Sequence, residues 1–164
     1  MTLADQRARD RILHELDINL IIEAAAGTGK TTELVRRIVA VVASGRTTLD
    51  KVVAVTFTEK AAGELKLRVR EHIEERRRAS TDPAERLRLD GALEKLEEAR
   101  ISTIHSFCRD LLLERPVEAG IDPLFEVAAQ DEADAILRIA FDRWFEEALR
   151  APGSGLKRML ARAD

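Results

Sequence analysis

The pattern of hydrophobic and polar positions along the chain predicts helices that alternate with short strands. From Lys60 to about Arg78 apolar side chains recur every three or four positions, which is typical of a helix with one buried face. A second helix with this spacing follows Lys30, and Gly45 is expected to cap its C-terminal end. Three short apolar runs are predicted to be strands, the second of them a buried parallel strand: residues 18–22, 51–57 and 101–104.

Capping signals divide the rest of the chain into further helices. Thr2 followed by Asp5 is expected to cap a first helix that runs to about Leu16, and Asp82 with Pro83 starts another helix. One further helix is expected to end before residue 116, and two others to cover residues 130–150 and 156–163. The helix that follows Pro83 has an apolar stripe of Leu87, Leu93 and Leu96. Alternating strands and helices predict an α/β fold, a parallel sheet with flanking helices, in residues 1–115. Residues 116–164 are predicted to begin a helical second domain.

Composition and charge restrict the class of protein. The chain has 164 residues, 45% of them hydrophobic and 35% charged, which is typical of a soluble globular protein. We expect no membrane span and no secretory signal, because no long apolar run is present. The single cysteine, Cys108, favours the cytoplasm. The net charge of −3 does not indicate nucleic-acid binding, although a local groove is enough for a translocating motor.

A glycine-rich loop carries the clearest chemical signal. It reads Ala24, Ala25, Ala26, Gly27, Thr28, Gly29, Lys30, Thr31, and Thr32 follows it. Small residues let backbone N–H groups approach phosphate oxygens, and the next helix presents its N-terminus to the anion. Lys30 would neutralise the β- and γ-phosphates of ATP, and the Thr31 hydroxyl would bind Mg²⁺. The loop therefore predicts an ATP–Mg²⁺ site.

One position departs from the usual phosphate-loop pattern. Ala24 stands where a glycine is common, so the first residue of the loop must use ordinary backbone angles. The alternative is a chance Gly/Ala turn that contains a lysine. The strand predicted before the loop and the helix predicted after it favour the phosphate loop.

Three further segments make the resemblance more specific. Residues 55–65 (VTFTEKAAGEL) follow the second strand, residues 102–108 (STIHSFC) follow the third, and Leu3 and Gln6 precede the loop. With the loop, they resemble the first motifs of the UvrD/Rep-like superfamily 1 DNA helicases. The sequences TFTEKAA and TIHSFC are more similar to those of the RecB/AddA branch, since relatives closer to UvrD and Rep usually have asparagine in place of Glu59. The resemblance covers most of residues 3–127.

The resemblance implies a RecA-like fold and a role for each motif. Gln6 would hydrogen-bond the adenine edge, although Ala4 stands where the family often has asparagine. The segments after the second and third strands would contact single-stranded DNA through hydroxyls, an aromatic ring and an imidazole: Thr56, Phe57, Thr58, Thr103 and His105.

Several of these residues also have simpler structural interpretations. Phe57 lies at a strand end and is explained equally well as a core residue or as a DNA contact. His105 has the alternative interpretation of a cap of the following helix. Cys108 is expected to be buried, and Arg76–Arg78 to form a solvated helix face beside Glu74 and Glu75. The aromatic residues of the 130–150 helix are expected in a core: Phe141, Trp144 and Phe145.

Parts of a complete motor are missing from the sequence. The stretch 125–132 ends in Asp131 and Glu132, but no buried apolar run precedes these acids, so Asp131 is interpreted as a helix N-terminal acid. We identify no acidic pair that would orient water, no arginine finger and no nuclease site. The chain is therefore expected to be a fragment that does not turn over ATP alone.

The leading hypothesis is the N-terminal part of an ATP-dependent DNA helicase, from a helicase–nuclease of double-strand break repair. Its expected partners are single-stranded or duplex-end DNA and a second subunit of such a complex. The alternatives are another P-loop enzyme, such as a small-molecule kinase, and a non-catalytic nucleotide- or DNA-binding module.

Overall fold

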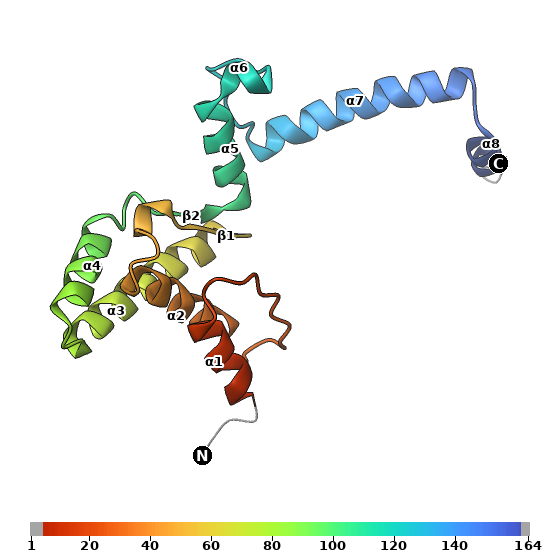
Figure 1. Ribbon diagram of the computed structural model, residues 1–164. Coiled ribbons are helices and arrows are strands. Elements are labelled where there is room, and N and C mark those ends of the chain that lie inside the picture. Colours follow the sequence, from red (N-terminus) through yellow and green to blue (C-terminus); the bar gives the residue numbers. More distant parts are fainter. Residues whose placement is uncertain (1–4, 162–164) are drawn as a thin grey trace. The chain divides into compact units, whose positions relative to one another are not determined.

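The computed structural model describes residues 5–161 and divides the chain into two compact units, Met1–Glu114 and Arg115–Asp164. Figure 1 shows the elements in chain order. Those of the first unit are α1 (Gln6–His14), α2 (Lys30–Ala43), a short 3₁₀ turn η1 (Leu49–Lys51), β1 (Val53–Thr56), α3 (Glu59–Ala79), α4 (Pro83–Glu94), β2 (Arg100–Thr103) and α5 (Ile104–Glu114). Those of the second unit are α6 (Pro116–Ala119), α7 (Gln130–Arg150) and α8 (Ser154–Leu160). The expected start of the first helix at Thr2, with Leu3 and Ala4, lies outside the described residues.

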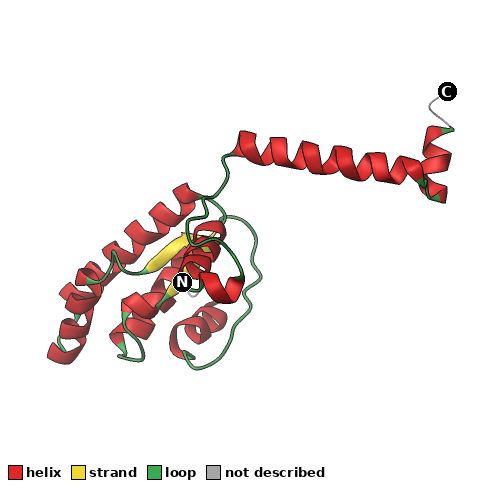
Figure 2. Ribbon diagram, turned by 90° about the horizontal axis from the view of Figure 1, so that it is seen from above, coloured by secondary structure: helices red, strands yellow, loops and turns green. Residues whose placement is uncertain are grey.

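The two strands pair in parallel, as the alternation of strands and helices predicts (Figure 2). Ala54 lies beside Ile101 in the register, and Thr56 beside Thr103, so both strands end at the same edge. Ala54 and Ile101 are buried, whereas Val53 and Val55 are 48% and 47% exposed. The parallel strand predicted over 51–57 is present as Val53–Thr56, but its predicted burial is wrong for one face, because helices among residues 5–161 cover the other face alone.

The core of the first unit lies between α2, α3, α4 and the covered face of the sheet. Helix α3 packs against α2, α4 and β2, and it buries the four positions that the helical spacing singles out: Ala62, Leu65, Val69 and Ile73. Asp82 caps α4, since its carboxylate accepts a hydrogen bond from the Ala84 N–H at 2.9 Å. The predicted stripe of α4 is wrong at Leu87, which is 74% exposed, because the helix buries Leu89 and Ala92 instead.

The segment predicted as a first strand is irregular in the structure. Residues 18–22 form no ladder within the described chain, and Ile21 is 96% exposed. Side chains of α2 and the turn after it hold the start of this segment instead: Arg37 donates to the Ile18 carbonyl at 3.0 Å, and Arg46 pairs with Asp17 at 2.9 Å. A strand needs backbone partners on a neighbouring strand, and the apolar pattern alone does not supply them.

The second unit consists of helices. Helix α7 covers the predicted range, and Asp131 lies in its first turn, as predicted. Phe141, Trp144 and Phe145 contact one another, with ring centroids 5.6–6.5 Å apart. The prediction that they form a core is wrong here, because Phe141 and Trp144 are exposed. Cys108, in α5 of the first unit, is also exposed rather than buried.

Gly45 provides a test of how the C-terminal end of α2 is fixed. It has a φ of 78° just beyond α2, and a Cβ there would lie 3.1 Å from Cδ of Arg88. We expect Gly45→Ala to lower the free energy of unfolding by about 1–2 kcal/mol, since a left-handed backbone is costly for residues with a Cβ. The control is Gly63→Ala in α3, where a Cβ meets no atom within 4 Å. It should raise stability by about 0.5–1 kcal/mol, and urea unfolding measures both. Equal effects of the two substitutions would contradict this account.

Candidate functional site

The glycine-rich loop leads directly into the N-terminus of α2. Gly27 and Gly29 adopt φ values of 77° and 92°, whereas no described non-glycine residue has a positive φ. Ala24 therefore uses ordinary backbone angles, as predicted. Nothing lies within 4 Å of a Cβ built on Gly27, so the loop surface is open at that point. Positive-φ glycines before a helix N-terminus let backbone N–H groups turn towards an anion.

Lys30, the first residue of α2, folds back over this loop. Its Nζ donates to the carbonyl oxygens of Ala24 at 2.5 Å and Ala25 at 2.7 Å. The Thr28 hydroxyl also donates to the Ala25 carbonyl, at 2.8 Å. These bonds close the loop on itself and hold the ammonium on its exposed side. A positive charge at a glycine-rich loop before a helix N-terminus suits the binding of phosphate groups.

Thr31 lies exposed in the first turn of α2, next to Lys30, and Thr32 is half-buried. The hydroxyl of Thr31 is a hard oxygen ligand that fits Mg²⁺. No group of three or more His, Cys, Asp or Glu side chains that fits a metal ion occurs among residues 5–161.

Gln6 begins α1, the helix that packs against α2. Its Nε2 donates to the Asp10 carboxylate at 2.9 Å, and the residue is half-exposed. An amide offers both a donor and an acceptor, which suits the edge of adenine.

The segments after β1 and β2 meet at one edge of the sheet, because Thr56 and Thr103 are neighbours in the register. Phe57 is 92% exposed, so its interpretation as a core residue is wrong. Thr58 caps α3 by accepting from the Ala61 N–H at 3.1 Å, and Thr56 donates to the Thr58 carbonyl at 3.0 Å. His105 is exposed in the first turn of α5. An exposed ring and an exposed imidazole at one edge offer stacking and hydrogen-bonding surfaces.

Thr103 has a different environment from these exposed residues. It is only 6% exposed, and its hydroxyl donates to the Glu59 carboxylate at 3.0 Å. Its oxygen also accepts from the Ser106 N–H at 3.2 Å, and the Ser106 hydroxyl bonds the same carboxylate at 3.2 Å. These bonds connect the segment after β1 to the segment after β2. These bonds give Thr103 a holding role in this structure, and its direct contact with DNA stays a prediction.

The Thr103 bonds carry a testable consequence for stability. We expect Thr103→Val to lower the free energy of unfolding by about 0.5–2 kcal/mol, as loss of a helix cap does. The matched control is Ser102→Ala, because that hydroxyl bonds only the neighbouring Thr103 carbonyl, at 3.2 Å. Urea unfolding with both variants measures the difference. A loss from Ser102→Ala as large as that from Thr103→Val would contradict a specific role for the network.

Sequence reasoning missed Arg9, which bonds the phosphate loop, and its partner Glu33. Arg9 in α1 donates to the Thr28 carbonyl at 3.0 Å and pairs with Glu33 of α2 at 2.7 Å. Glu33 is buried despite its charge. The only signal in the sequence is an acid among the apolar positions of α2, and it does not identify the partner.

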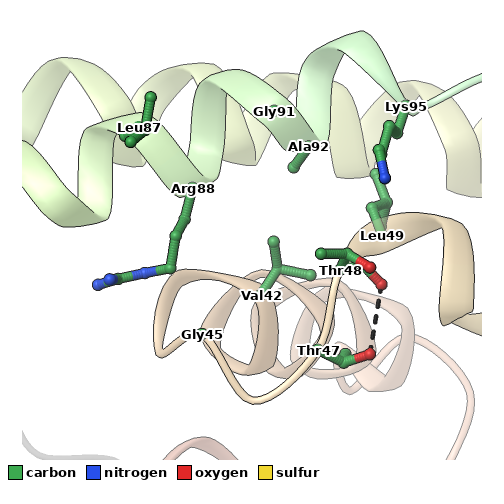
Figure 3. A pocket seen from close by; sticks show the side chains of 10 residues that line it. All are labelled: Val42, Gly45, Thr47, Thr48, Leu49, Leu87, Arg88, Gly91, Ala92 and Lys95. Carbon is green, nitrogen blue, oxygen red and sulfur yellow. Dashed lines mark hydrogen bonds between the residues drawn. The ribbon is translucent and has the colours of Figure 1, made fainter.

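A separate cavity of about 370 Å³ lies between α4 and the turn after α2 (Figure 3). Val42, Leu49 and Ala92 give it apolar walls, with Arg88 and Lys95 at its ends. Arg88 donates to the Ala43 carbonyl at 2.6 Å, so it also caps α2. None of the predicted nucleotide or DNA residues lines this cavity.

Arginines 76–78 form ion pairs on the helix surface, as predicted for a solvated face. Arg76 pairs with Glu85 at 2.6 Å, Arg77 pairs with Asp90, and Arg78 pairs with Glu74 at 3.1 Å.

Across residues 5–161, none of the helices has the length and apolar character that crossing a membrane requires.

The sequence of this chain matches a family model and several known proteins. A family model described as the UvrD/REP helicase N-terminal domain matches residues 4–157. The chain is 35% identical over 147 residues to exonuclease/helicase subunit RexA of Lactococcus lactis subsp. cremoris (strain MG1363), which covers 89% of this chain and 12% of that protein. It is 36% identical over 132 residues to an ATP-dependent helicase/nuclease subunit of Syntrophomonas wolfei, covering 78% and 10%. The protein of the same name from Enterococcus faecalis is 37% identical over 134 residues, covering 82% and 10%. The chain spans about a tenth of the length of these relatives.

Proposed function

Because this chain belongs to the UvrD/REP helicase N-terminal domain family, we propose that it is the N-terminal part of an ATP-dependent DNA helicase. Residues 1–115 form the start of its first motor domain, and residues 116–164 begin a helical accessory domain. The similarity to ATP-dependent helicase/nuclease subunits supports a helicase–nuclease of double-strand break repair, with DNA ends as its substrate and a second protein chain as its partner. The proposed setting is the cytoplasm, which keeps the exposed Cys108 reduced.

The observation that carries the proposal is the loop of residues 24–31 with Lys30 held on its open side. The loop N–H groups and Lys30 bind the phosphates of ATP, Thr31 binds Mg²⁺, and Gln6 binds the adenine edge. Bound Mg²⁺ neutralises charge that develops on the phosphates during phosphoryl transfer. The acids that orient water and the arginine finger come from parts of the motor beyond these residues.

The second half of the proposal places single-stranded DNA across the shared edge of β1 and β2. Phe57 stacks on a base, and Thr56, Thr58 and His105 contact the strand nearby. The Glu59–Thr103–Ser106 bonds keep the two segments at a fixed separation. The proposed nucleotide and DNA sites thus lie within one structural unit.

The test is ATP hydrolysis by the complete protein, with and without single-stranded DNA. We expect turnover that DNA stimulates several-fold. Phosphate transfer to a small molecule without DNA stimulation would identify a kinase instead. Binding of both ligands without turnover would identify a non-catalytic module.

A further inference from the structure

The Arg9 guanidinium contacts three parts of the first unit. Nη2 donates to the Thr28 carbonyl of the phosphate loop at 3.0 Å, and Nη1 pairs with Glu33 of α2 at 2.7 Å. Nη2 also pairs with Asp5, the residue that precedes α1, at 2.8 Å. A Cβ built on Gly29 would lie 3.5 Å from Nη1, so the guanidinium lies in van der Waals distance of the last loop glycine.

We propose that Arg9 and Glu33 form a latch that fixes the phosphate loop to helix α1 and so sets the spacing between Gln6 and Lys30. Arg9 is a positioning residue, because it acts through the loop and through α1. The inference rests on the proposed ATP site. Its consequence is that helix α1 and the phosphate loop are already aligned when they bind the adenine and the phosphates of ATP.

Burial of Glu33 supports a positional role. A buried carboxylate is costly unless it is paired, and apolar residues of similar size often stabilise a protein as well as a buried ion pair does. Arg36 also reaches Glu33, at 3.3 Å, but it lies on the same helix and is exposed. Among residues 5–161, only the Arg9 side chain connects the Glu33 carboxylate to another element. Its planar fork donates in several directions at once, which a lysine ammonium does not reproduce.

The geometry of the latch predicts how its loss changes binding. Gln6 and Arg9 are both on α1, whereas Thr28 and Lys30 belong to the loop and α2. Arg37 still holds α1 to α2 through the Ile12 carbonyl at 2.6 Å, but without the Arg9 bond to Thr28 the loop can shift against α1. ATP then loses the benefit of two contacts that are already aligned. A ligand that has phosphates but no base loses less.

The experiment uses the 164-residue chain and its variants. The ¹⁵N heteronuclear NOE of Gly27 and Gly29 reports the order of the loop, and titrations with ATP and with tripolyphosphate report binding. The variants are Arg9→Ala, the double variant Arg9→Met/Glu33→Leu, and Gln6→Ala alone and combined with Arg9→Ala. The matched control is Arg11→Ala, which removes an exposed pair with Glu15 on the same helix without touching the loop.

We expect the double variant to melt near the temperature of the unaltered chain, because apolar groups replace the whole pair. Its loop glycines should nevertheless show lower NOE values, and the Kd for ATP should rise several-fold more than the Kd for tripolyphosphate. Gln6→Ala should weaken ATP binding alone but add little after Arg9→Ala. Arg11→Ala should change none of these quantities.

Loop order and ATP affinity that are unchanged in the double variant would overturn the latch. An equal rise in the two Kd values would also overturn it, because only phosphate binding would then depend on Arg9. If the unaltered chain bound neither ligand, the NOE values would still decide whether Arg9 orders the loop, and ATP binding by the complete protein would decide the proposed ATP site.

Discussion

Replacement of Lys30 by alanine is expected to abolish ATP turnover in the complete protein and leave its fold intact. Within the part of the chain that the structure describes, the exposed Lys30 ammonium bonds the Ala24 and Ala25 carbonyls, which are exposed as well, so its removal buries no unpaired group there. A hydrogen bond to a charged group contributes about 1.5–3 kcal/mol, so ATP binding should weaken by roughly tenfold to a hundredfold. Turnover falls further, because the same charge stabilises the phosphoryl-transfer transition state.

Steady-state phosphate release and circular dichroism give the two measurements for Lys30→Ala. The control is Lys51→Ala, which removes an exposed lysine from η1, away from the loop. It should leave turnover and melting temperature unchanged. Turnover of Lys30→Ala within a few-fold of the unaltered protein would reject the assignment of residues 24–31 to phosphate binding.

Local signals in the sequence predict most of the helices of the fold. The spacing of Ala62, Leu65, Val69 and Ile73 is enough to identify the buried face of α3, since these side chains lie on one side of any helix. The cap of α4 at Asp82 is equally local, because it needs only a carboxylate two positions before an N–H. Such features depend on neighbours in the chain and not on the rest of the fold.

The features that the sequence does not predict depend on distant partners. Residues 18–22 have a strand composition, but a strand forms only where another strand offers its backbone. Phe141 and Trp144 have the spacing of a core, but burial requires a second apolar surface, and within this chain they remain exposed. The exposure of Val53 and Val55 has the same cause.

The candidate site likewise contains features that neighbouring residues predict and features that depend on distant partners. The loop could be predicted because its chemistry lies in consecutive residues from Ala24 to Thr31. The pairing of Arg9 with Glu33 could not, because it joins side chains 24 positions apart and depends on how α1 packs against α2. The bond between Thr103 and Glu59 is also long-range, and it turns inward a hydroxyl that the motif alone suggests is available to DNA.

Replacement of Phe57 by alanine is expected to weaken single-stranded DNA binding by the complete protein and to leave its stability unchanged. The ring is 92% exposed, so its removal creates no cavity. Loss of one base–aromatic stack costs about 1–3 kcal/mol, which is a factor of roughly 5 to 150 in Kd. Stacking releases no counterions, so the dependence of log Kd on log salt should keep its slope.

Fluorescence anisotropy with a labelled oligonucleotide at several salt concentrations measures both the affinity and the slope. Phe57→Trp should restore most of the binding, because the larger ring keeps a stacking face. Leu87→Ala is the matched control, since it removes another exposed apolar side chain of the same unit, away from the edge where β1 and β2 end.

If Phe57→Ala lowered the melting temperature and left the Kd unchanged, the ring would have a structural role, and the path of DNA would have to lie elsewhere. If the affinity fell and the salt slope fell with it, the variant would have lost phosphate contacts as well, and Phe57 would act by positioning its neighbours rather than by stacking.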